Sequence, residues 1–427
     1  MTHVLPPCRT PHLRSSLRPG RRTPLLTLLV AGLLATTGCT DGMPGSNAEG
    51  GDRVQLDSLE VETLYQVGEL DGEDWETFGQ VSAVEFMDDG SLLIVDRQQS
   101  HVVVLDPDGQ FVRTFGRQGQ GPGEFQSVQR ATVLGSGEIA LPDMAQGRVH
   151  VFGADGEYLR SVVTPHGDGV PGGRMGAHGE AGLVGPKTVL FEAASGPRPD
   201  PPRTRPFGHW DLGEAEVEPR SRVIHEAWIP QVESEGARIA GADGNVRAAV
   251  GSSTFQPSLL HAVLPDGRLA VADSTTYTIR IVDAHDGVVD VVEKPHAPWP
   301  VTEAVERAYR ESMEEAATGQ IMGPDGPIDA SEVIQARLES MTFWPERSIL
   351  ADLDADRAGR LWVRRSAEDP MEVGPVDLLL PDGSHLGTLP AETTLPHAFG
   401  PGDLAAWIEE DEFRVQYVRV GRIANLP

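Results

Sequence analysis

The residue types used in familiar catalytic motifs occur in this chain without the spacing that those motifs need. The histidines after residue 39 are scattered, and none forms a His-x-x-x-His pair or a His-Glu-x-x-His helical zinc motif. No Gly-x-Ser-x-Gly nucleophile turn and no Gly-Lys-Ser/Thr phosphate-binding loop is present. We therefore predict no cofactor and no metal ligand set. Calcium or zinc, held by side chains from separate parts of the chain, stays an open alternative.

Aspartates occur in two patterns that could hold a cation. Asp352, Asp354 and Asp356 alternate as in a calcium loop, but Arg357 stands where that loop needs glycine for its sharp bend. We interpret this segment as a strand and a turn. A second set recurs at one position of an internal repeat: Asp96, Asp143 and Asp273. An aspartate that caps the amides of the following loop explains the recurrence without a ligand.

Polar side chains suited to ligand binding follow the apolar runs of the first two repeats. They are Arg97, His101, Arg117, Gln129, Arg130 and Arg148. Arginine pairs well with carboxylate or phosphate groups, and the other side chains can form hydrogen bonds. In a four-stranded repeat, the loop between the second and third strands and the link to the next repeat share one face. We predict a ligand-binding mouth at that face; the alternative is a solvated rim that binds nothing.

The internal repeat determines where these side chains lie. Residues 84–116 and 131–163 each contain four short apolar runs in one register, so that Asp89-Gly90 matches Ser136-Gly137. Asp-Gly between β-branched runs indicates a hairpin, because the turn needs a positive φ that glycine and aspartate tolerate. Four antiparallel strands in a repeat of this length are typical of a β-propeller blade.

We predict an all-β fold, a six-bladed β-propeller. The clearest blades are 80–116, 128–163, 259–292 and 348–390. A degraded blade could occupy 180–255, and a strand at 413–420 could pair with one around 54–67, because closing the ring removes exposed strand edges. The segment around 301–340 contains helical spacing, which predicts a small helical insertion, either a decorated loop or a lid.

Several pieces of the first blade resemble the NHL repeat. They are Leu-Leu-Ile-Val-Asp96, Val-Val-Val-Leu-Asp-Pro-Asp-Gly109 and Phe-Gly-Arg-Gln-Gly-Gln-Gly-Pro-Gly-Glu-Phe125. The resemblance is close over residues 80–165 and loose at 259–292 and 348–390. It implies a six-bladed, NHL-like propeller of the sort found among bacterial envelope lipoproteins. It implies no reaction, because a fold does not determine an activity.

The N-terminal segment predicts export. Residues 1–24 are arginine-rich, an apolar run follows over residues 25–35, and small residues lead to Cys39. The run is about half of the roughly 20 residues that span a bilayer. The cysteine resembles that of the bacterial lipobox, which implies lipid attachment at Cys39; an ordinary signal peptide is the alternative. We predict a lipoprotein signal peptide at 1–38, a flexible tether at 39–52 and the propeller domain at 53–427.

The net charge of −29 at pH 7 narrows the choice of partners. Such a charge repels nucleic acid phosphates and anionic lipid headgroups, so we expect no nucleic acid and no membrane contact except the lipid anchor. We expect a monomer in the cell envelope, with the outer membrane or periplasm favoured, that binds a protein, peptide or glycan at its loop face without catalysis. The alternative is a propeller enzyme, metal-dependent and lactonase- or lyase-like, with its site at the central channel.

Overall fold

The chain divides into two units, residues 1–51 and 52–427. The structure, a computed structural model, describes residues 55–163, 170–171, 173–188, 204–213, 221–230, 237–240, 246–250, 253–315, 320–323, 326–329, 335, 338 and 341–427. All of these belong to the second unit. The predicted signal peptide, the tether and Cys39 lie outside the described residues.

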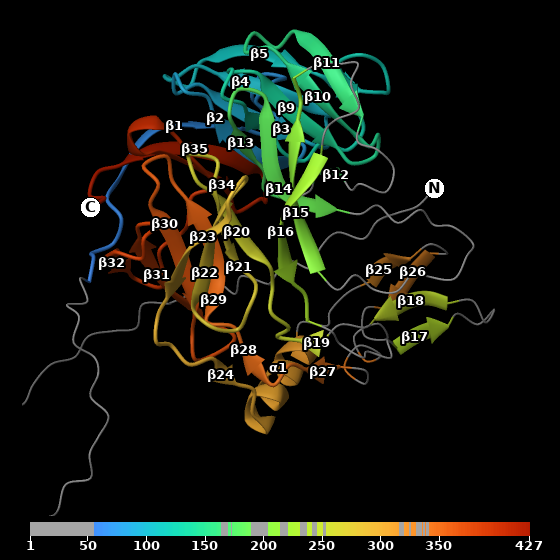
Figure 1. Ribbon diagram of the computed structural model, residues 1–427. Coiled ribbons are helices and arrows are strands. Elements are labelled where there is room, and N and C mark those ends of the chain that lie inside the picture. The colour runs from blue at the N-terminus through green and yellow to red at the C-terminus, as the bar shows by residue number, and fades with distance from the viewer. Residues whose placement is uncertain are drawn as a thin grey trace, which may run out of the picture. The chain divides into compact units, whose positions relative to one another are not determined.

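The first half of the second unit forms three antiparallel sheets (Figure 1). The first consists of β2 (Val81–Phe86), β3 (Leu92–Asp96), β4 (His101–Leu105) and β5 (Phe111–Phe115). The second consists of β8 (Thr132–Val133), β9 (Ile139–Asp143), β10 (Arg148–Phe152) and β11 (Tyr158–Val163). The third consists of β13 (Gly176–His178), β14 (Gly182–Thr188), β15 (Thr204–Asp211) and β16 (Ser221–Trp228), and β12 (Val170–Pro171) also pairs with β14.

Three further sheets follow. The fourth consists of β20 (Leu260–Val263), β21 (Leu269–Ala272), β22 (Thr278–Asp283) and β23 (Gly287–Glu293). The fifth consists of β29 (Leu350–Ala355), β30 (Leu361–Ser366), β31 (Val373–Leu379) and β32 (His385–Leu389). The sixth consists of β33 (Ala398–Phe399), β34 (Leu404–Glu410), β35 (Gln416–Ile423) and β1 (Val61–Val67).

The sixth sheet joins the two ends of the unit. The N-terminal strand β1 pairs antiparallel with β35, and in Figure 1 the blue and red strands lie side by side. The predicted closure of the ring by these two segments is therefore confirmed. The chain is a six-bladed β-propeller, as the repeat predicted.

Packing between neighbouring sheets explains why the blade sequences contain continuous apolar runs. Six clusters of buried apolar residues lie between consecutive sheets, including one between the sixth and the first. In β3, Leu92 and Ile94 pack toward the sixth sheet, while Leu93 and Val95 pack toward the second. Successive strand residues point to opposite faces, so a strand that is covered on both faces needs apolar residues throughout.

The Asp-Gly turns have the backbone conformation that the sequence predicted. Gly109, between β4 and β5, has a φ of 81°. A Cβ atom at this position would lie 2.5 Å from the ring of Tyr65 on β1, so the turn requires glycine for space as well as for conformation. This contact joins a turn of the first blade to the outermost strand of the sixth.

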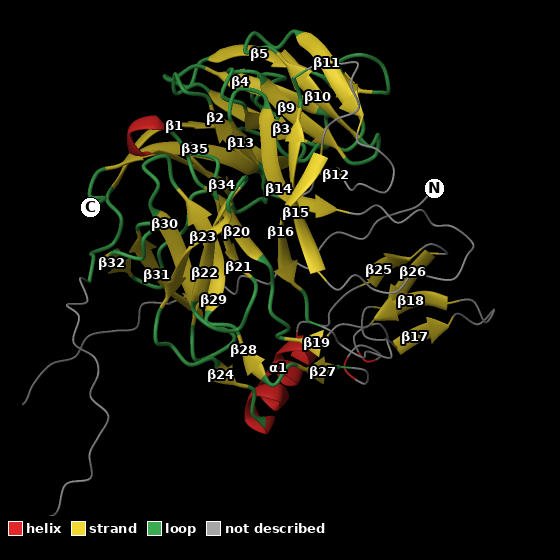
Figure 2. Ribbon diagram, in the orientation of Figure 1, coloured by secondary structure: helices red, strands yellow, loops and turns green. Residues whose placement is uncertain are grey.

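The remaining described elements are short strand pairs and helices (Figure 2). The strands are β6 (Arg117–Gln118), β7 (Glu124–Phe125), β17 (Ala237–Ala240), β18 (Val246–Val250), β19 (Ser253–Thr254), β24 (Trp299–Pro300), β25 (Gln320–Gly323), β26 (Gly326–Asp329), β27 (Thr342–Phe343) and β28 (Glu346–Arg347). A 3-10 helix, η1 (Pro401–Asp403), precedes β34. No helix in the described ranges is long and apolar enough to cross a membrane.

The predicted helical insertion contains α1 (Glu303–Glu315). Tyr309 of α1 stacks edge-on against Phe255, with ring centroids 5.0 Å apart, and Arg310 lies over Phe343 at 5.0 Å. These contacts attach α1 to the segments around β19 and β27. Most of the second predicted helical stretch, 331–340, lies outside the described residues.

Candidate ligand site in the central channel

One side-chain position recurs on the innermost strand of every blade. At this position each residue pairs with the residue eight places later on the next strand, so all six occupy the same register. The six are Glu85, Thr132, Gly176, Ala262, Asp354 and Ala398. Four of them are small, which leaves open space between the two carboxylic acids.

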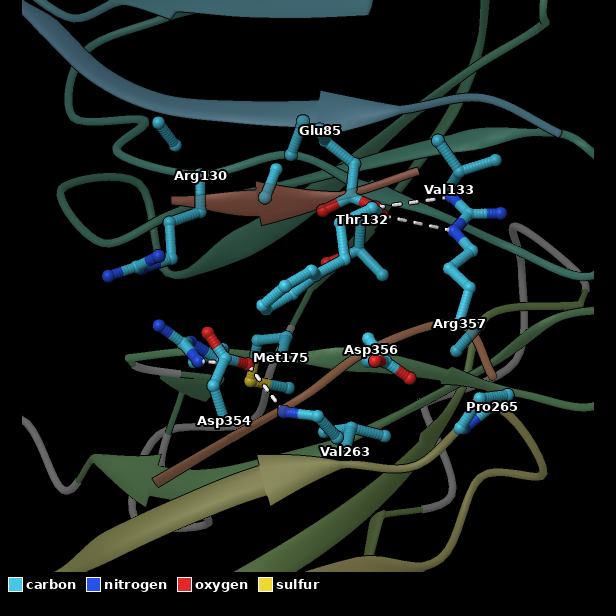
Figure 3. Close-up of a pocket in the computed structure, with 18 of the residues that line it drawn as sticks. Glu85, Arg130, Thr132, Val133, Met175, Val263, Pro265, Asp354, Asp356 and Arg357 are labelled. Carbon is cyan, nitrogen blue, oxygen red and sulfur yellow. Dashed lines mark hydrogen bonds and ion pairs between the residues drawn. The ribbon is translucent and has the colours of Figure 1, made fainter. Parts of the chain in front are cut away.

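That space is a cavity of about 320 Å³, lined by residues from the innermost strands of all six blades. Three arginines contribute to its wall. Arg130 and Arg174 lie two residues before the recurring position of the second and third blades, and Arg357 follows β29. Figure 3 shows Glu85, Arg130, Asp354 and Arg357 extending into this space from separate elements. The wall carries charges of both signs, because Asp88 and Asp356 line it together with Glu85 and Asp354.

Two of the arginines pair with the carboxylates. Arg174 forms an ion pair with Asp354. Arg357 lies 3.6 Å from Glu85, contacts Asp88 at 2.5 Å, and donates to the carbonyl oxygen of Phe86. Arg357 therefore connects the fifth blade to the first, and its charge is already balanced.

Arg130 is different, because it forms no hydrogen bond or ion pair with any residue in the described part of the chain. Burial lowers the pKa of Arg130 and the neighbouring Arg174 lowers it further, whereas the charges of Asp354 and Glu85 act in the opposite direction. Its guanidinium nevertheless remains charged at neutral pH, since arginine does not lose its proton in proteins. Arg130 is a cation facing a cavity, available to an anionic group.

The two carboxylic acids have strongly perturbed pKa values. Burial raises the pKa of Glu85 to about 7, although Arg357 and Arg174 act in the opposite direction. Burial likewise raises the pKa of Asp354 to about 6, against the effect of Arg174. Near neutral pH, Glu85 therefore exists in both protonation states and can donate or accept a hydrogen bond. Shifted pKa values gathered in one cavity are typical of functional sites.

The structure brings one of the six sequence-predicted residues into the cavity, namely Arg130. The other five do not line the cavity that the described residues enclose. Arg117 is exposed (77%) and forms an ion pair with Glu124 at 2.8 Å. Arg97 donates a hydrogen bond of 2.8 Å to Gln80. Gln129 is exposed.

His101 and Arg148 occupy equivalent places in the first two blades. His101 begins β4 and pairs with Asp96, whereas Arg148 begins β10 and pairs with Asp143. Burial lowers the pKa of His101, so its ring is neutral at physiological pH. Neither residue lines the cavity.

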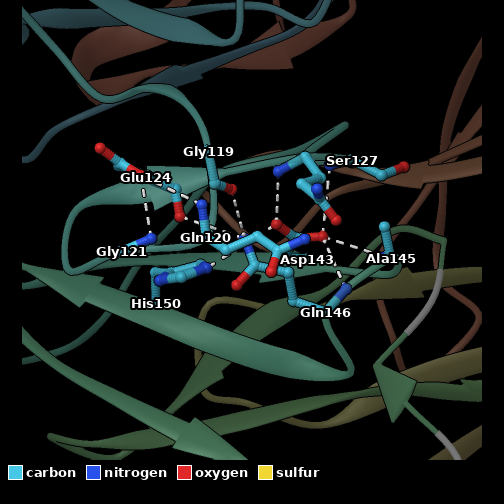
Figure 4. Close-up of polar contacts among 10 residues, drawn as sticks. Gly119, Gln120, Gly121, Glu124, Ser127, Asp143, Ala145, Gln146 and His150 are labelled. Atoms are coloured by element: carbon cyan, nitrogen blue, oxygen red, sulfur yellow. Dashed lines mark hydrogen bonds and ion pairs between the residues drawn. The ribbon is translucent and has the colours of Figure 1, made fainter.

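The recurring aspartates cap loops, as the sequence predicted. Asp143 is fully buried and accepts hydrogen bonds from the amides of Gln126, Ser127, Ala145 and Gln146, at 2.7–3.2 Å (Figure 4). Two of these amides belong to the link between blades and two to the loop after β9. Each aspartate therefore fixes the entry of the chain into its blade.

Asp96 and Asp273 have comparable environments. Asp96 accepts four amide hydrogen bonds, including one of 2.6 Å from Gly79. Asp273 accepts one of 2.6 Å from the amide of Trp228 and pairs with Arg280 at 2.6 Å. Among the described residues, no group of three or more His, Cys, Asp or Glu side chains is arranged to hold a metal ion.

Sequence reasoning missed four residues of the cavity: Glu85, Arg174, Asp354 and Arg357. A signal for two of them was present in the repeat. Glu85 stands five residues before Gly90, and Asp354 stands five before Gly359; both glycines have positive φ in a hairpin turn. Counting back from the turn glycine would have placed both carboxylic acids at one level of the channel. Arg174 stands at the same repeat position as Arg130, whereas Arg357 has no arginine counterpart in another blade.

Comparisons with known proteins found one matching family model and several similar solved structures. The family described as a 6-bladed beta-propeller (DUF5128) matches residues 66–166. A duf4221 family member from Bacteroides vulgatus is 13% identical, with 86% of this chain and 99% of that chain covered and a TM-score of 0.45. A gluconolactonase from Xanthomonas campestris is 10% identical (86% and 94% covered, TM-score 0.39). Virginiamycin B lyase from Staphylococcus aureus is 11% identical (86% and 90% covered, TM-score 0.38). No curated protein sequence matches the chain.

Proposed function

We propose that this propeller binds a small, hydroxylated acid in its central channel, and that binding occurs there rather than at the loop face. The observation that supports this proposal is Arg130, a cation without a partner among the described residues, at the wall of a cavity. A guanidinium offers a carboxylate two parallel hydrogen bonds. Arg97 and Arg117 of the loop face, in contrast, already have side-chain partners, Gln80 and Glu124.

The other polar groups of the cavity suit the hydroxyl groups of such a ligand. Glu85, with a pKa of about 7, can donate or accept a hydrogen bond near neutral pH, whereas Asp354, with a pKa of about 6 and an ion pair to Arg174, mainly accepts. Thr132 adds a hydroxyl at the same level. A volume of about 320 Å³ is at the lower end of the roughly 300–1,000 Å³ of small-molecule pockets. We infer that the ligand is a single acidic sugar residue or a hydroxy acid of similar size, free or at the end of a glycan.

Arg130→Met should weaken binding of glucuronate, galacturonate or gluconate by about tenfold or more. The expected size follows from a charge-assisted hydrogen bond, worth about 1.5–3 kcal/mol. Affinity is measured by titration calorimetry and by ligand-observed NMR, with neutral glucose as the uncharged counterpart.

Arg117→Met is the matched control, because Arg117 belongs to the loop face and lies outside the cavity. It should leave the affinity unchanged. If ligand binding survives Arg130→Met and disappears with Arg117→Met, the ligand site lies at the loop face and not in the channel.

Acid–base catalysis in the channel is a second candidate function, supported by the pKa of Glu85 near 7. A group whose pKa lies near the working pH is the most effective general acid or base. A lactonase- or lyase-like reaction on a sugar acid would fit the same cavity. The NMR samples test this directly, because turnover changes the spectrum of the ligand itself.

We also propose that lipid on Cys39 anchors the protein to the cell envelope, in the outer membrane or facing the periplasm. The support is the arginine-rich start, the short apolar run and the small residues before Cys39. Cys39→Ser should move the protein from the membrane pellet to the soluble fraction, as seen by immunoblotting after fractionation. Thr40→Ser is the control and should stay in the pellet. A Cys39→Ser protein that remains in the pellet would contradict lipid attachment.

A further inference from the structure

Two histidine rings of the third blade meet edge to face. His178 ends β13 and His209 lies on β15, and their ring planes are 90° apart with centroids at 4.9 Å. Nδ1 of His178 lies 3.2 Å from Nε2 of His209. Gly182 leaves room for this contact, because a Cβ atom at that position would lie 2.8 Å from Nε2 of His209.

The distance between these nitrogens suits two ligands of one metal ion. Zinc binds imidazole nitrogen at about 2.0–2.1 Å in tetrahedral geometry, which places two ligand nitrogens about 3.3–3.4 Å apart. Without a metal, the same spacing needs one ring to donate its N–H to the other. The donating ring can instead carry its proton on its other nitrogen. Both facing nitrogens then have free lone pairs, and a zinc ion can take the place of the hydrogen atom.

A third histidine lies within reach of the pair. The ring centroid of His285 is 6.0 Å from that of His178, and its side chain is 71% exposed on the turn between β22 and β23. An exposed side chain on a turn can change rotamer without disturbing the core. The pair and His285 therefore come from two neighbouring blades, the third and the fourth.

Charged groups of both signs lie near the three rings. Asp283 and Asp211 lie beside the three rings, and their charges act on His285 and His209 respectively. Arg222 is also close, but its guanidinium donates to the carbonyl oxygen of Ala284.

We propose that His178 and His209 form a preorganised half of a zinc site, which His285 completes by rotating toward the bound ion. Imidazole nitrogen is a preferred ligand of zinc, and calcium and magnesium prefer oxygen. Solvent or a neighbouring aspartate would occupy the fourth position. The site is independent of the channel cavity, because none of the three histidines lines it.

The test is titration of the whole purified chain with zinc, followed by calorimetry, and with cobalt(II), followed by its visible absorption. We expect one zinc ion per chain and cobalt bands typical of tetrahedral coordination with nitrogen ligands. His209→Gln should weaken zinc binding by more than about tenfold, since even residues that only support a ligand are worth about 10- to 100-fold. His285→Gln should weaken it as well and shift the cobalt bands.

His296→Gln is the matched control, because His296 stacks on Tyr277 at a different part of the propeller. It should leave both titrations unchanged. The circular dichroism spectrum of each variant shows whether it is folded. The titration of the wild type tests the proposal independently of any variant. Absence of stoichiometric zinc and of tetrahedral cobalt bands in the wild type would overturn the proposal. So would zinc binding that is the same in His209→Gln as in the wild type.

Discussion

Asp143→Ala is expected to lower the free energy of unfolding by about 3–5 kcal/mol, the range for removing one partner of a buried charged group. The carboxylate has no exposed surface and accepts hydrogen bonds from four backbone amides, so its removal leaves four donors without a partner in a dry interior. Because two of these amides belong to the link before β8, the entry of the chain into the second blade should loosen as well.

The measurement is urea denaturation of wild type and variant, followed by tryptophan fluorescence. Asp411→Ala is the matched control, because Asp411 also caps two amides, at 2.8 and 2.9 Å, but is exposed. Water can replace a carboxylate at that position, so we expect a loss of only about 0.5–1 kcal/mol. Equal losses in the two variants would mean that burial of Asp143 contributes nothing, and the capping interpretation would then be wrong.

The blades could be predicted from the sequence because their signals are local. A continuous apolar run such as Leu92–Val95 indicates a strand that is covered on both faces, and an Asp-Gly turn such as that at Gly109 indicates a hairpin. Both signals need only neighbouring residues. Asp96 and Asp143 recur at one repeat position, and this recurrence indicated a structural role. Such a role is expected at a repeat position because the loop that enters a blade must be held in place.

The cavity was harder to predict, because its residues come from separate blades and are related only through the register of the repeat. Arg174 precedes a strand of the third blade, whose sequence has lost most of the repeat, and Arg357 occupies a turn in the fifth. The charged rim residues stand in loops, where ligand-binding side chains are common. In the structure Arg117 is paired with Glu124, whereas Arg130 extends into the channel.

The two carboxylic acids of the channel reduce stability at neutral pH. A carboxylate that is held in a cavity with a raised pKa costs free energy whenever it is ionised, and a glutamine or alanine at the same place would not. Proteins retain such groups where function needs them, at the expense of stability. Glu85 is the clearest case, because its pKa is raised although Arg357 lies 3.6 Å away.

Glu85→Gln should therefore stabilise the protein at pH 8 and leave its stability unchanged at pH 4.5. A folded-state pKa of about 7, against 4.5 in the unfolded chain, means that the folded state binds more protons between these values. Stability then falls as pH rises from about 4.5 to 7, and the penalty is complete above that range. The full shift corresponds to about 3 kcal/mol. Because 33% of the side chain is exposed, we expect about 1–3 kcal/mol.

Glu138→Gln provides a control of opposite sign. Glu138 accepts hydrogen bonds of 2.7 and 2.8 Å from Arg160, and these lower its pKa. The contribution of Glu138 to the free energy of unfolding is present above the unfolded-state pKa and is lost as the pH falls below it. Glu138→Gln should therefore destabilise the protein at pH 8 and destabilise it less at low pH. The measurement is the melting temperature of wild type, Glu85→Gln and Glu138→Gln from pH 4 to 8, which gives the pH dependence of both effects in one experiment. A Glu85→Gln protein that melts below wild type at pH 8 would show that the ion pair with Arg357 outweighs burial. Glu85 would then be a structural residue of the channel wall, and Arg130 alone would remain to support ligand binding there.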